Sequence, residues 1–344
     1  MFLKEGTRQM FVDLGYEEKA CEKLKNDDRD DEFLVSRIIF LTTYGTNVSL
    51  ATLVEKFRLA ESIAQNLARH AERFSSKAPE TKQNPMVDMA LTETAKLLFN
   101  VTHFSAKHVA DFTQAIPHIV KLLYTHDVPS KTAPLTTPIG SLVNALLNLE
   151  LASGDVQPAL FPESDPKVFA ERLLELLDLS MKSYSDLELE QSVSPLVGVL
   201  GKIYGVAPDS VRETIRDKLL PTEEDWKNVL GRSSTLSSRL LRNSTNPAAP
   251  ELGKAISNLF FDLSDRDPSK FVQNVGYGYA SGFLFQNNLP IPQAASETLT
   301  AGGKKEINPI TGQFLDAEKF PDTPEMTEEE KEREAERLFV LFER

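Results

Sequence analysis

The chain has 344 residues, a formal net charge of −13, 41% hydrophobic and 26% charged residues, and a single cysteine. This length exceeds one ordinary core, so we expect either several domains or one elongated repeat array. The acidic balance argues against nucleic acid as a partner, because phosphate binding depends on lysine and arginine. No apolar run reaches the roughly eighteen residues that a membrane span requires.

Cys21 is the lone cysteine, and the N-terminal sequence MFLKEGTRQMF lacks the apolar stretch and the cleavage site of a secretory signal. A single cysteine excludes an internal disulfide framework. We therefore expect a chain that works in the reducing cytoplasm or nucleus.

Apolar residues recur at helical spacing along most of the chain, whereas the two-residue alternation of strands is almost absent. The pattern predicts an all-α fold. The helices are expected to break at clusters of Gly, Pro, Asp and Asn, where proline removes a hydrogen-bond donor. In chain order, the expected helices are 31–44, 49–71, 86–103, 106–125, 138–152, 166–182, 187–204, 208–219, 222–230, 234–242, 249–263 and 267–285.

Four of these helices carry one narrow polar strip between apolar flanks. At about 3.6 residues per turn, the polar positions of each helix fall on one face. Corresponding positions recur about every fifty residues, close to the length of armadillo and HEAT units. The strip residues are Glu93, Lys96 and Asn100 on the first helix, Asn144 and Asn148 on the second, Lys202 on the third, and Lys254 and Asn258 on the fourth.

Stacked repeats bury their apolar flanks against their neighbours and leave the inner strips on a continuous concave wall. The sequence therefore predicts a helical solenoid over residues 1–290, whose concave strip binds another protein. A second interpretation stays open for each asparagine. Its amide could bond the backbone of its own repeat, because buried amides need hydrogen-bond partners.

Arg232, Arg239 and Arg242 form the densest arginine cluster without acidic neighbours. Arg239 and Arg242 are three residues apart on an expected helix, and the planar guanidinium suits a carboxylate. We expect this pair to meet the terminal carboxylate of a bound helix. The alternative is an ordinary solvated helix surface.

Catalytic and metal-binding motifs do not emerge from the sequence. The five histidines lack the HExxH spacing, no GxSxG or P-loop occurs, and the stretch GYGYASG at 276–282 falls within a helical segment. We expect no catalytic residues, no metal and no cofactor.

The end of the chain has its own pattern. Residues 291–325 are punctuated by proline and predict an extended strap, and residues 326–344 predict a closing helix. Thr327 and Glu330 form a capping box at the start of this helix. Leu338, Phe339 and Phe342 make an apolar face, which we expect to dock on the last repeats or on a partner.

Several segments together resemble the synembryn family of cytoplasmic exchange factors and folding chaperones of heterotrimeric G-protein α subunits. They are FLVSRIIFLTTYGTNV, ETAKLLFNVT, KFVQNVGYGYASGFL and, most distinctive, the strap INPITGQ, followed by MTEEEKE. The strap contributes Asn308, Pro309 and Gly312. The likeness extends from Phe33 to Arg344 and is stronger toward fungal than toward animal members.

This resemblance implies a right-handed superhelix of armadillo and HEAT-like repeats, in agreement with the helical pattern. It also implies that the concave groove grips the C-terminal helix of an α subunit, that GDP then leaves, and that binding energy replaces covalent catalysis. The expected contact residues are Arg37, the strip residues named above, Arg239 and Arg242.

The same resemblance implies a monomeric, cytoplasmic protein that reaches the inner face of the plasma membrane only through the α subunit. An alternative function is a helical-repeat adaptor that binds peptides and has no effect on nucleotide exchange. The repeated tryptophans of import adaptors are missing, since Trp226 is the only tryptophan, and this weighs against the adaptor.

Overall fold

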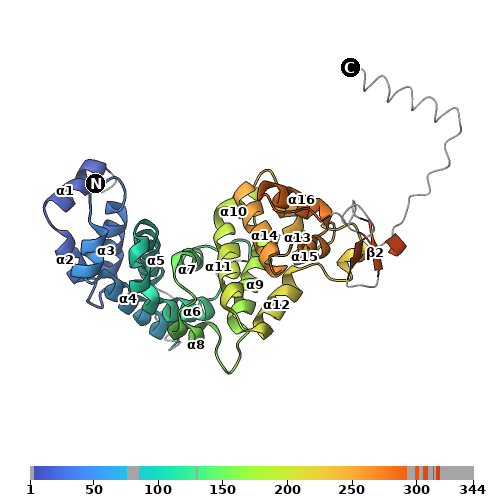
Figure 1. Cartoon of the computed structure of the whole chain (residues 1–344). Coiled ribbons are helices and arrows are strands. Elements are labelled where there is room, and N and C mark those ends of the chain that lie inside the picture. The colour runs from blue at the N-terminus through green and yellow to red at the C-terminus, as the bar shows by residue number, and fades with distance from the viewer. Residues whose placement is uncertain are drawn as a thin grey trace, which may run out of the picture.

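The structure, a computed structural model, describes residues 4–75, 85–128, 131–292, 299–301, 305–308, 313 and 315–317. These residues form an array of helices with one short hairpin near the end, which confirms the predicted all-α repeat fold. Figure 1 shows the helices following one another along an elongated, curved body.

The α-helices are α1 Glu5–Asp13, α2 Glu17–Lys23, α3 Arg29–Thr42, α4 Leu59–Ser75, α5 Pro85–Phe104, α6 Ile116–Thr125, α7 Ile139–Asn148, α8 Gln157–Leu160, α9 Val168–Ser183, α10 Asp186–Ser192, α11 Ser194–Val206, α12 Asp209–Leu219, α13 Leu236–Ser244, α14 Pro250–Leu263, α15 Pro268–Val275 and α16 Tyr277–Gln286. Short 3-10 or π segments are η1 Thr52–Lys56, η2 Ala106–Ala115, η3 Gly154–Val156, η4 Asp225–Lys227 and η6 Leu315–Ala317. The strands are β1 Leu299–Ala301 and β2 Lys305–Ile307.

The helices stack in two rows. Helices α3, α5, α7, α11 and α14 pack on one another in that order and form the inner row, while α4, α6, α9 and α12 form a second row behind it. In Figure 1, α3, α5 and α7 lie along the upper side, α4, α6 and α8 lie below them, and the upper outline dips at α7. The inner row therefore lines the hollow side, as expected of a helical solenoid.

A continuous apolar core lies between the rows. Leu91, Leu142, Leu200 and Ile256, one from each of four inner helices, are fully buried. Burial of each such side chain contributes about 1.5–3 kcal/mol to stability before chain entropy is subtracted. Across the described ranges, no helix combines the length and the apolar composition that crossing a bilayer demands.

Several helices begin at side-chain caps that the sequence provides. The Asp28 carboxylate accepts hydrogen bonds from the amides of Asp30 and Asp31 at the start of α3, both at 2.9 Å. Asp267 caps α15 in the same way, and Pro268 occupies the first helical position. These caps satisfy amides that have no partner within the helix.

Four expected helices are each divided into two elements. The helix expected over 49–71 is η1 and α4, that over 106–125 is η2 and α6, that over 187–204 is α10 and α11, and that over 267–285 is α15 and α16. Arg58, with φ 57°, separates η1 from α4, and Gly276, with φ 84°, separates α15 from α16. A positive φ cannot continue a right-handed helix.

The prediction of a helix over 222–230 is wrong, because only the short turn η4 forms there. The buried Asp225 carboxylate accepts a hydrogen bond from the Thr222 amide at 2.9 Å, and it also accepts bonds from the hydroxyls of Ser233, Thr235 and Ser237 at 2.7–3.0 Å. These contacts gather residues 222–238 into a turn around one carboxylate. The hydrogen bonds hold the pKa of Asp225 below its usual value even though burial raises it.

The described part of the expected strap includes two short strands. Strands β1 and β2 pair as an antiparallel hairpin, with Thr300 opposite Glu306. The Asn308 amide donates to the Gln313 carbonyl at 2.8 Å, and the Gln313 side chain donates to the Lys227 carbonyl at 3.0 Å. The Gln313 contact attaches the middle of the strap to η4.

Helices α1 and α2 were not expected from the sequence, because they precede 31–44, the first predicted helix. The remaining strap and closing-helix residues, Pro309, Gly312, Thr327, Glu330, Leu338, Phe339 and Phe342, lie outside the described residues.

A substitution at Gly276 tests whether the break between α15 and α16 contributes to stability. Gly276→Ala should lower the free energy of unfolding by about 1–3 kcal/mol, because the positive φ strains any other residue and the new Cβ would lie 3.1 Å from Leu230 Cδ1. Urea denaturation measures this difference. Gly278→Ala is the matched control, since open space surrounds that position, and it should be neutral or stabilising by up to ~1 kcal/mol. Equal effects of the two changes would contradict this account of the break.

Candidate protein-binding site

Side chains of the inner row bind the carboxyl end of the preceding inner helix. The Asn100 amide on α5 donates to Thr43 Oγ1, just after α3, at 2.8 Å. On α7, Asn148 donates to the Phe99 carbonyl at 3.0 Å and to Thr102 Oγ1 at 3.3 Å, both in the last turns of α5. Each contact ties one repeat to the next.

Lys202 makes the corresponding contact from α11. Its ammonium donates to the carbonyls of Leu147 and Leu149 at the end of α7, at 2.8 and 2.7 Å. The last carbonyls of a helix have no partner inside the helix and carry partial negative charge, so a lysine satisfies both needs. Burial lowers the pKa of Lys202, although the charge of Glu150 opposes the shift.

At the junction between α11 and α14, a side chain binds the amino end of the later helix instead of the carboxyl end of the earlier one. Glu190 on α10 accepts hydrogen bonds from the amides of Glu251 and Leu252, at 3.1 and 3.0 Å, at the start of α14. Asn258 does not reach the preceding helix, and its amide donates to the Lys254 carbonyl of its own helix at 2.9 Å. We call the contacts of Asn100, Asn148 and Lys202 the inter-repeat clamps.

The inter-repeat clamps help to distinguish the two interpretations of the strip, which are contact with a partner and bonding to the backbone of the same repeat. Asn148 and Lys202 bond backbone carbonyls, as the second interpretation proposed for the asparagines, but the carbonyls belong to the neighbouring repeat. Asn144 is half-buried on α7, and Lys254 and Asn258 are exposed on α14. The polar residues in the middle of the strip therefore hold neighbouring repeats together, whereas polar groups at its two ends remain accessible.

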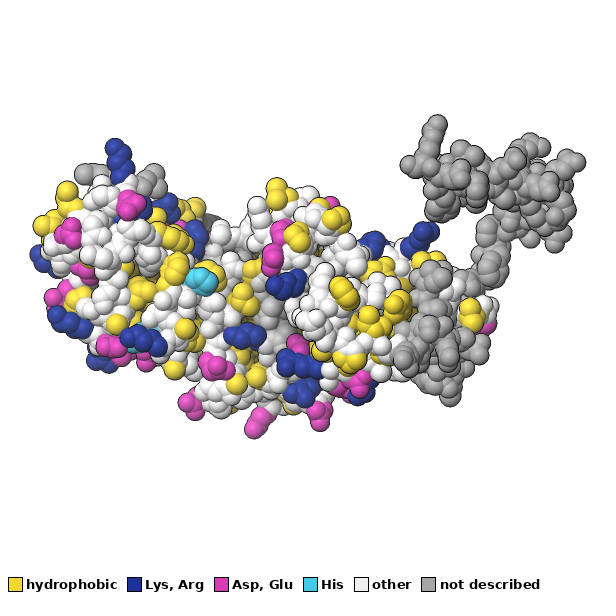
Figure 2. Space-filling model, turned by 45° about the horizontal axis from the view of Figure 1, so that its top comes forward, with side chains coloured by type: hydrophobic (Ala, Val, Ile, Leu, Met, Phe, Trp, Pro, Cys, Tyr) yellow, Lys and Arg dark blue, Asp and Glu magenta, His cyan; other side chains and the backbone are white. Residues whose placement is uncertain are grey.

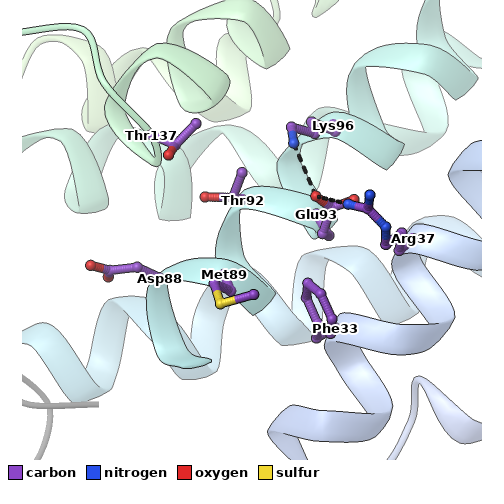
Figure 3. Close-up of a pocket in the computed structure, with 8 residues that line it drawn as sticks. All are labelled: Phe33, Arg37, Asp88, Met89, Thr92, Glu93, Lys96 and Thr137. Atoms are coloured by element: carbon purple, nitrogen blue, oxygen red, sulfur yellow. Dashed lines mark hydrogen bonds and ion pairs between the residues drawn. The ribbon is translucent and has the colours of Figure 1, made fainter. Parts of the chain in front are cut away.

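A pocket of about 240 Å³ opens on the inner row between α3, α5 and the start of α7. It unites three residues that were expected from the sequence to contact a partner, Arg37, Glu93 and Lys96, as Figure 3 shows. The remaining lining residues are Phe33, Asp88, Met89, Thr92 and Thr137.

One buried carboxylate organises the charges of this pocket. Glu93 Oε1 accepts hydrogen bonds from Arg37 at 3.1 Å and from Lys96 at 2.9 Å, while Glu93 itself is only 3% exposed. Two cations thus share one carboxylate, and each retains further N–H donors. Asp88 also lines the pocket, so its two cations face two carboxylates, and the remaining N–H donors of Arg37 and Lys96 can receive a carboxylate.

The structure gives Arg239 and Arg242 contacts within the chain. Arg239, mostly buried, forms an ion pair with Asp178 of α9 and donates to the Ser234 carbonyl. Arg242 is exposed and donates to the Gly231 carbonyl and, at 3.1 Å, to the Ser233 carbonyl. Both arginines hold the turn that precedes α13, and they lie far along the array from the pocket between α3 and α5.

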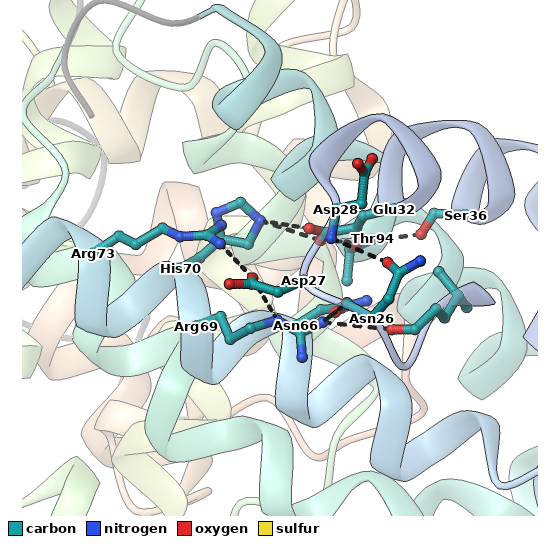
Figure 4. A network of polar contacts seen from close by, with 11 residues as sticks. Asn26, Asp27, Asp28, Glu32, Ser36, Asn66, Arg69, His70, Arg73 and Thr94 are labelled. Carbon is teal, nitrogen blue, oxygen red and sulfur yellow. Dashed lines mark hydrogen bonds and ion pairs between the residues drawn. The ribbon is translucent and has the colours of Figure 1, made fainter. Parts of the chain in front are cut away.

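A buried polar network underlies the pocket and joins α3, α4 and α5 (Figure 4). The Glu32 oxygens lie 3.1 Å from His70 Nε2, and Thr94 Oγ1 donates to Glu32 Oε1 at 2.7 Å. Ser36 extends the network through Thr94. Burial raises the pKa of Glu32, but the hydrogen bonds from His70 and Thr94 hold it below its usual value.

Two other histidines have acidic neighbours. His126 Nε2 lies 3.3 Å from Asp88, and His108 contacts Glu55 and Asp111. Among the described residues, no group of three or more His, Cys, Asp and Glu side chains is placed to hold a metal ion.

The apolar part of this surface was not predicted from the sequence. Phe33 and Met89 line the pocket, and Tyr44 and Phe104 are exposed near the carboxyl ends of α3 and α5. Their positions continue the polar strips at helical spacing, and that continuation was the available signal. An amphipathic pattern, however, assigns such residues to the core.

The fold defines a helical-repeat protein whose inner row carries a pocket between α3, α5 and the start of α7. The family model described as guanine nucleotide exchange factor synembryn matches residues 1–344, and the chain belongs to this family.

Curated relatives agree with this assignment. A synembryn-like chaperone of Schizosaccharomyces pombe is 24% identical over 93% of this chain and 62% of its own length. The chaperone Ric-8A of Macaca fascicularis is 27% identical over 92% of this chain and 62% of its own, and that of Gallus gallus is 28% identical over 73% and 50%. The chain thus spans about three fifths of the length of the first two relatives.

The Lys202 clamp can be tested by stability. Lys202→Ala should lower the free energy of unfolding by roughly 1–3 kcal/mol, because it leaves two helix-end carbonyls without their donor. Lys254→Ala removes an exposed lysine from α14 and should change stability by less than about 0.5 kcal/mol. Thermal and urea unfolding of the two variants provide the measurement. If the Lys202 variant is as stable as the control, the Lys202 contacts do not stabilise the stacking of α11 on α7.

Glu32 should make stability depend on pH. Since its folded pKa lies below the unfolded value of about 4.3, its contribution is complete at neutral pH and is lost as the pH falls through the folded pKa. Glu32→Gln should be less stable than the parent at pH 7, and the gap should narrow in acid. Urea unfolding from pH 7 to pH ~3 measures the gap. A gap that stays constant would show that Glu32 ionisation does not support the α3–α4–α5 junction.

Proposed function

We propose that this chain is a guanine nucleotide exchange factor and folding chaperone for a heterotrimeric G-protein α subunit. The observation that carries the proposal is the match of residues 1–344 to a family described as a guanine nucleotide exchange factor. The relatives named as chaperones support the second activity. The inner row, with its pocket of charged and apolar side chains, supports the proposal as a surface for the partner.

In this proposal, the C-terminal helix of the α subunit lies along the inner row, and the chain works by binding alone. A protein that binds the open, nucleotide-free α subunit more tightly than the closed, GDP-bound form shifts the population toward the open form, and GDP leaves. By linkage, GTP weakens the complex by the same factor by which the chain weakens GTP binding. Preference for the nucleotide-free form also explains chaperone activity, because a newly made α subunit holds no nucleotide. The cytoplasm, at the inner face of the plasma membrane, is where the two proteins would meet.

Two pairs of cations could receive a carboxylate of the bound helix, one on the inner row and one on α13, which packs on α9 and α12 of the second row as well as on α14. The pair Arg239 and Arg242 is one, but there Arg239 must exchange its ion pair with Asp178 for the incoming group. Arg37 needs no such exchange, because it is exposed and donates one hydrogen bond to Glu93. We therefore assign Arg37 and Lys96 as the primary contact for a carboxylate, with Arg242 as a second contact.

Release of radiolabelled GDP from a purified α subunit tests the proposal. The chain should accelerate release, and Arg37→Ala should weaken the complex about tenfold or more, since a hydrogen bond to a charged group contributes about 1.5–3 kcal/mol. Arg58→Ala is the control, because Arg58 likewise pairs with one carboxylate, that of Glu61, but precedes α4 of the other row.

The outcomes separate the functions. Faster GDP release by the parent chain supports an exchange factor. Binding of the α subunit without faster release would instead support a helical-repeat adaptor, and absence of both would refute the proposal. Equal weakening by Arg37→Ala and Arg58→Ala would exclude the pocket as the contact.

A further inference from the structure

The segment between η4 and α13 brings exposed hydroxyl groups close to a buried carboxylate. No helix covers residues 228–235, and Arg232 and Thr235 are exposed in this stretch. Asp225, by contrast, is only 3% exposed and accepts hydrogen bonds from hydroxyls of the same stretch. We call residues 222–238 the Asp225 turn. A change at its surface can therefore act directly on a group in the interior.

Thr235 connects the surface to that carboxylate. Its hydroxyl donates to Asp225 Oδ1 at 2.7 Å, and its oxygen accepts a hydrogen bond from the Ser238 amide at 3.3 Å as the cap of α13. The Ser233 hydroxyl lies 2.8 Å from the same oxygen. One exposed side chain thus holds both the buried carboxylate and the first turn of α13.

The sequence before Thr235 fits a protein kinase that selects arginine. Arg232 precedes Thr235 by three residues, and kinases distinguish their substrates by the charges near the acceptor. A segment outside the helices is also the kind that an enzyme can reach and bend. On the face shown in Figure 2, basic and acidic side chains are interspersed. Recognition by charge would therefore depend on the local sequence rather than on a broad basic surface.

Thr245 provides a comparison within the same chain. Arg242 precedes it by the same three residues, and both side chains are exposed. Residues 236–244, however, form α13. The helix holds Arg242 within one turn of Thr245, whereas Arg232 and Thr235 can extend together. The spacing of the two residues is therefore the same at both places, but the backbone that presents them differs.

We propose that Thr235 is a phosphorylation site for an arginine-selective kinase and that the phosphate opens the Asp225 turn. In the reaction, the Thr235 oxygen attacks the γ-phosphorus of ATP, and the bond from that phosphorus to the bridging oxygen of the β-phosphate breaks. The hydroxyl proton passes to the base of the kinase, and ADP leaves. This proposal is independent of the proposed function.

The phosphate places two negative groups side by side. Asp225 loses the hydroxyl hydrogen that it accepts, and the new group carries about −1.5 to −2 charges at pH 7. Because it is attached to an oxygen 2.7 Å from Asp225 Oδ1, it repels the buried carboxylate. The Thr235 side chain then rotates outward, where Arg232 attracts the phosphate. The bond to Asp225 and the cap on the Ser238 amide are lost together.

The opening extends to the strap. Asp225, Trp226 and Lys227 form η4, and the Lys227 carbonyl accepts the hydrogen bond from Gln313 at 3.0 Å. A displaced η4 therefore loses this attachment. Trp226 is 5% exposed and is the single tryptophan of the chain. Its fluorescence consequently reports on the Asp225 turn.

Mapping of the phosphate tests the site. The whole chain is incubated with ATP and a purified kinase that selects arginine three residues before the acceptor, and tandem mass spectrometry identifies the modified residues. Thr235 should be the main acceptor, Thr245 should stay unmodified, and Arg232→Ala should slow the reaction about tenfold. Thr235→Ser keeps a hydroxyl and should still be modified at this position. Phosphate at Thr245 in place of Thr235, or an unmodified chain, would overturn the proposal.

Trp226 emission and proteolysis test the opening. The phosphorylated chain should emit at longer wavelength than the unmodified chain, because the indole meets water. Trypsin should cut after Lys227 or Arg232 about tenfold faster, since loss of a hydrogen bond to a charged group raises the open population by roughly that factor. A sample incubated with the kinase but without ATP is the control. Equal emission and equal cleavage of the two chains would overturn the opening.

Two variants separate the charge from the loss of the hydroxyl. Thr235→Glu adds a negative charge, and Thr235→Gln is its neutral match in size. The glutamate variant should reproduce the shift to longer wavelength, the glutamine variant should show a smaller shift, and Thr245→Glu should emit like the parent. Circular dichroism checks that each variant keeps its helices. Equal shifts for Thr235→Glu and Thr235→Gln would refute repulsion of Asp225 as the cause of the opening.

Discussion

The stack of inner helices depends on hydrogen bonds between a side chain of one helix and the carboxyl end of the helix before it. Apolar burial supplies most of the stability, but it has no direction and tolerates sliding of one helix along the next. Asn148 and Lys202 remove that freedom, because their donors reach particular carbonyls. Asn100 does the same for α3 and α5 through Thr43. The fixed register then sets Arg37 beside Glu93 and produces the pocket.

The sequence was sufficient to predict the all-helical repeat fold and most helix positions, since both follow from periodicity and from Gly and Pro breaks. It could not locate the interruptions at Arg58 and Gly276, where an apolar pattern continues across a residue with positive φ. It also failed at 222–230, where helical propensity is overridden by Asp225. That carboxylate accepts hydrogen bonds from hydroxyl groups as far along the chain as Ser237. Contacts of this kind produce no periodic pattern in the sequence.

Prediction of the site was less complete. Arg37, Glu93 and Lys96 were expected on the strip, and the structure brings them together. The pattern could not distinguish these residues from Lys202, because a helix-end clamp and a partner-binding group are both polar residues on an otherwise apolar helix. Nor could it assign Tyr44 and Phe104, whose exposure depends on where the neighbouring helices end.

The inter-repeat clamps join adjacent layers only, so the array behaves mechanically as a chain of stiff blocks with a hinge at each junction. A small tilt at every junction adds up along the inner row, because repeat arrays transmit strain from neighbour to neighbour. A modest bend shared among all the layers would therefore widen or tighten the hollow. No apolar core has to open for this elastic adjustment.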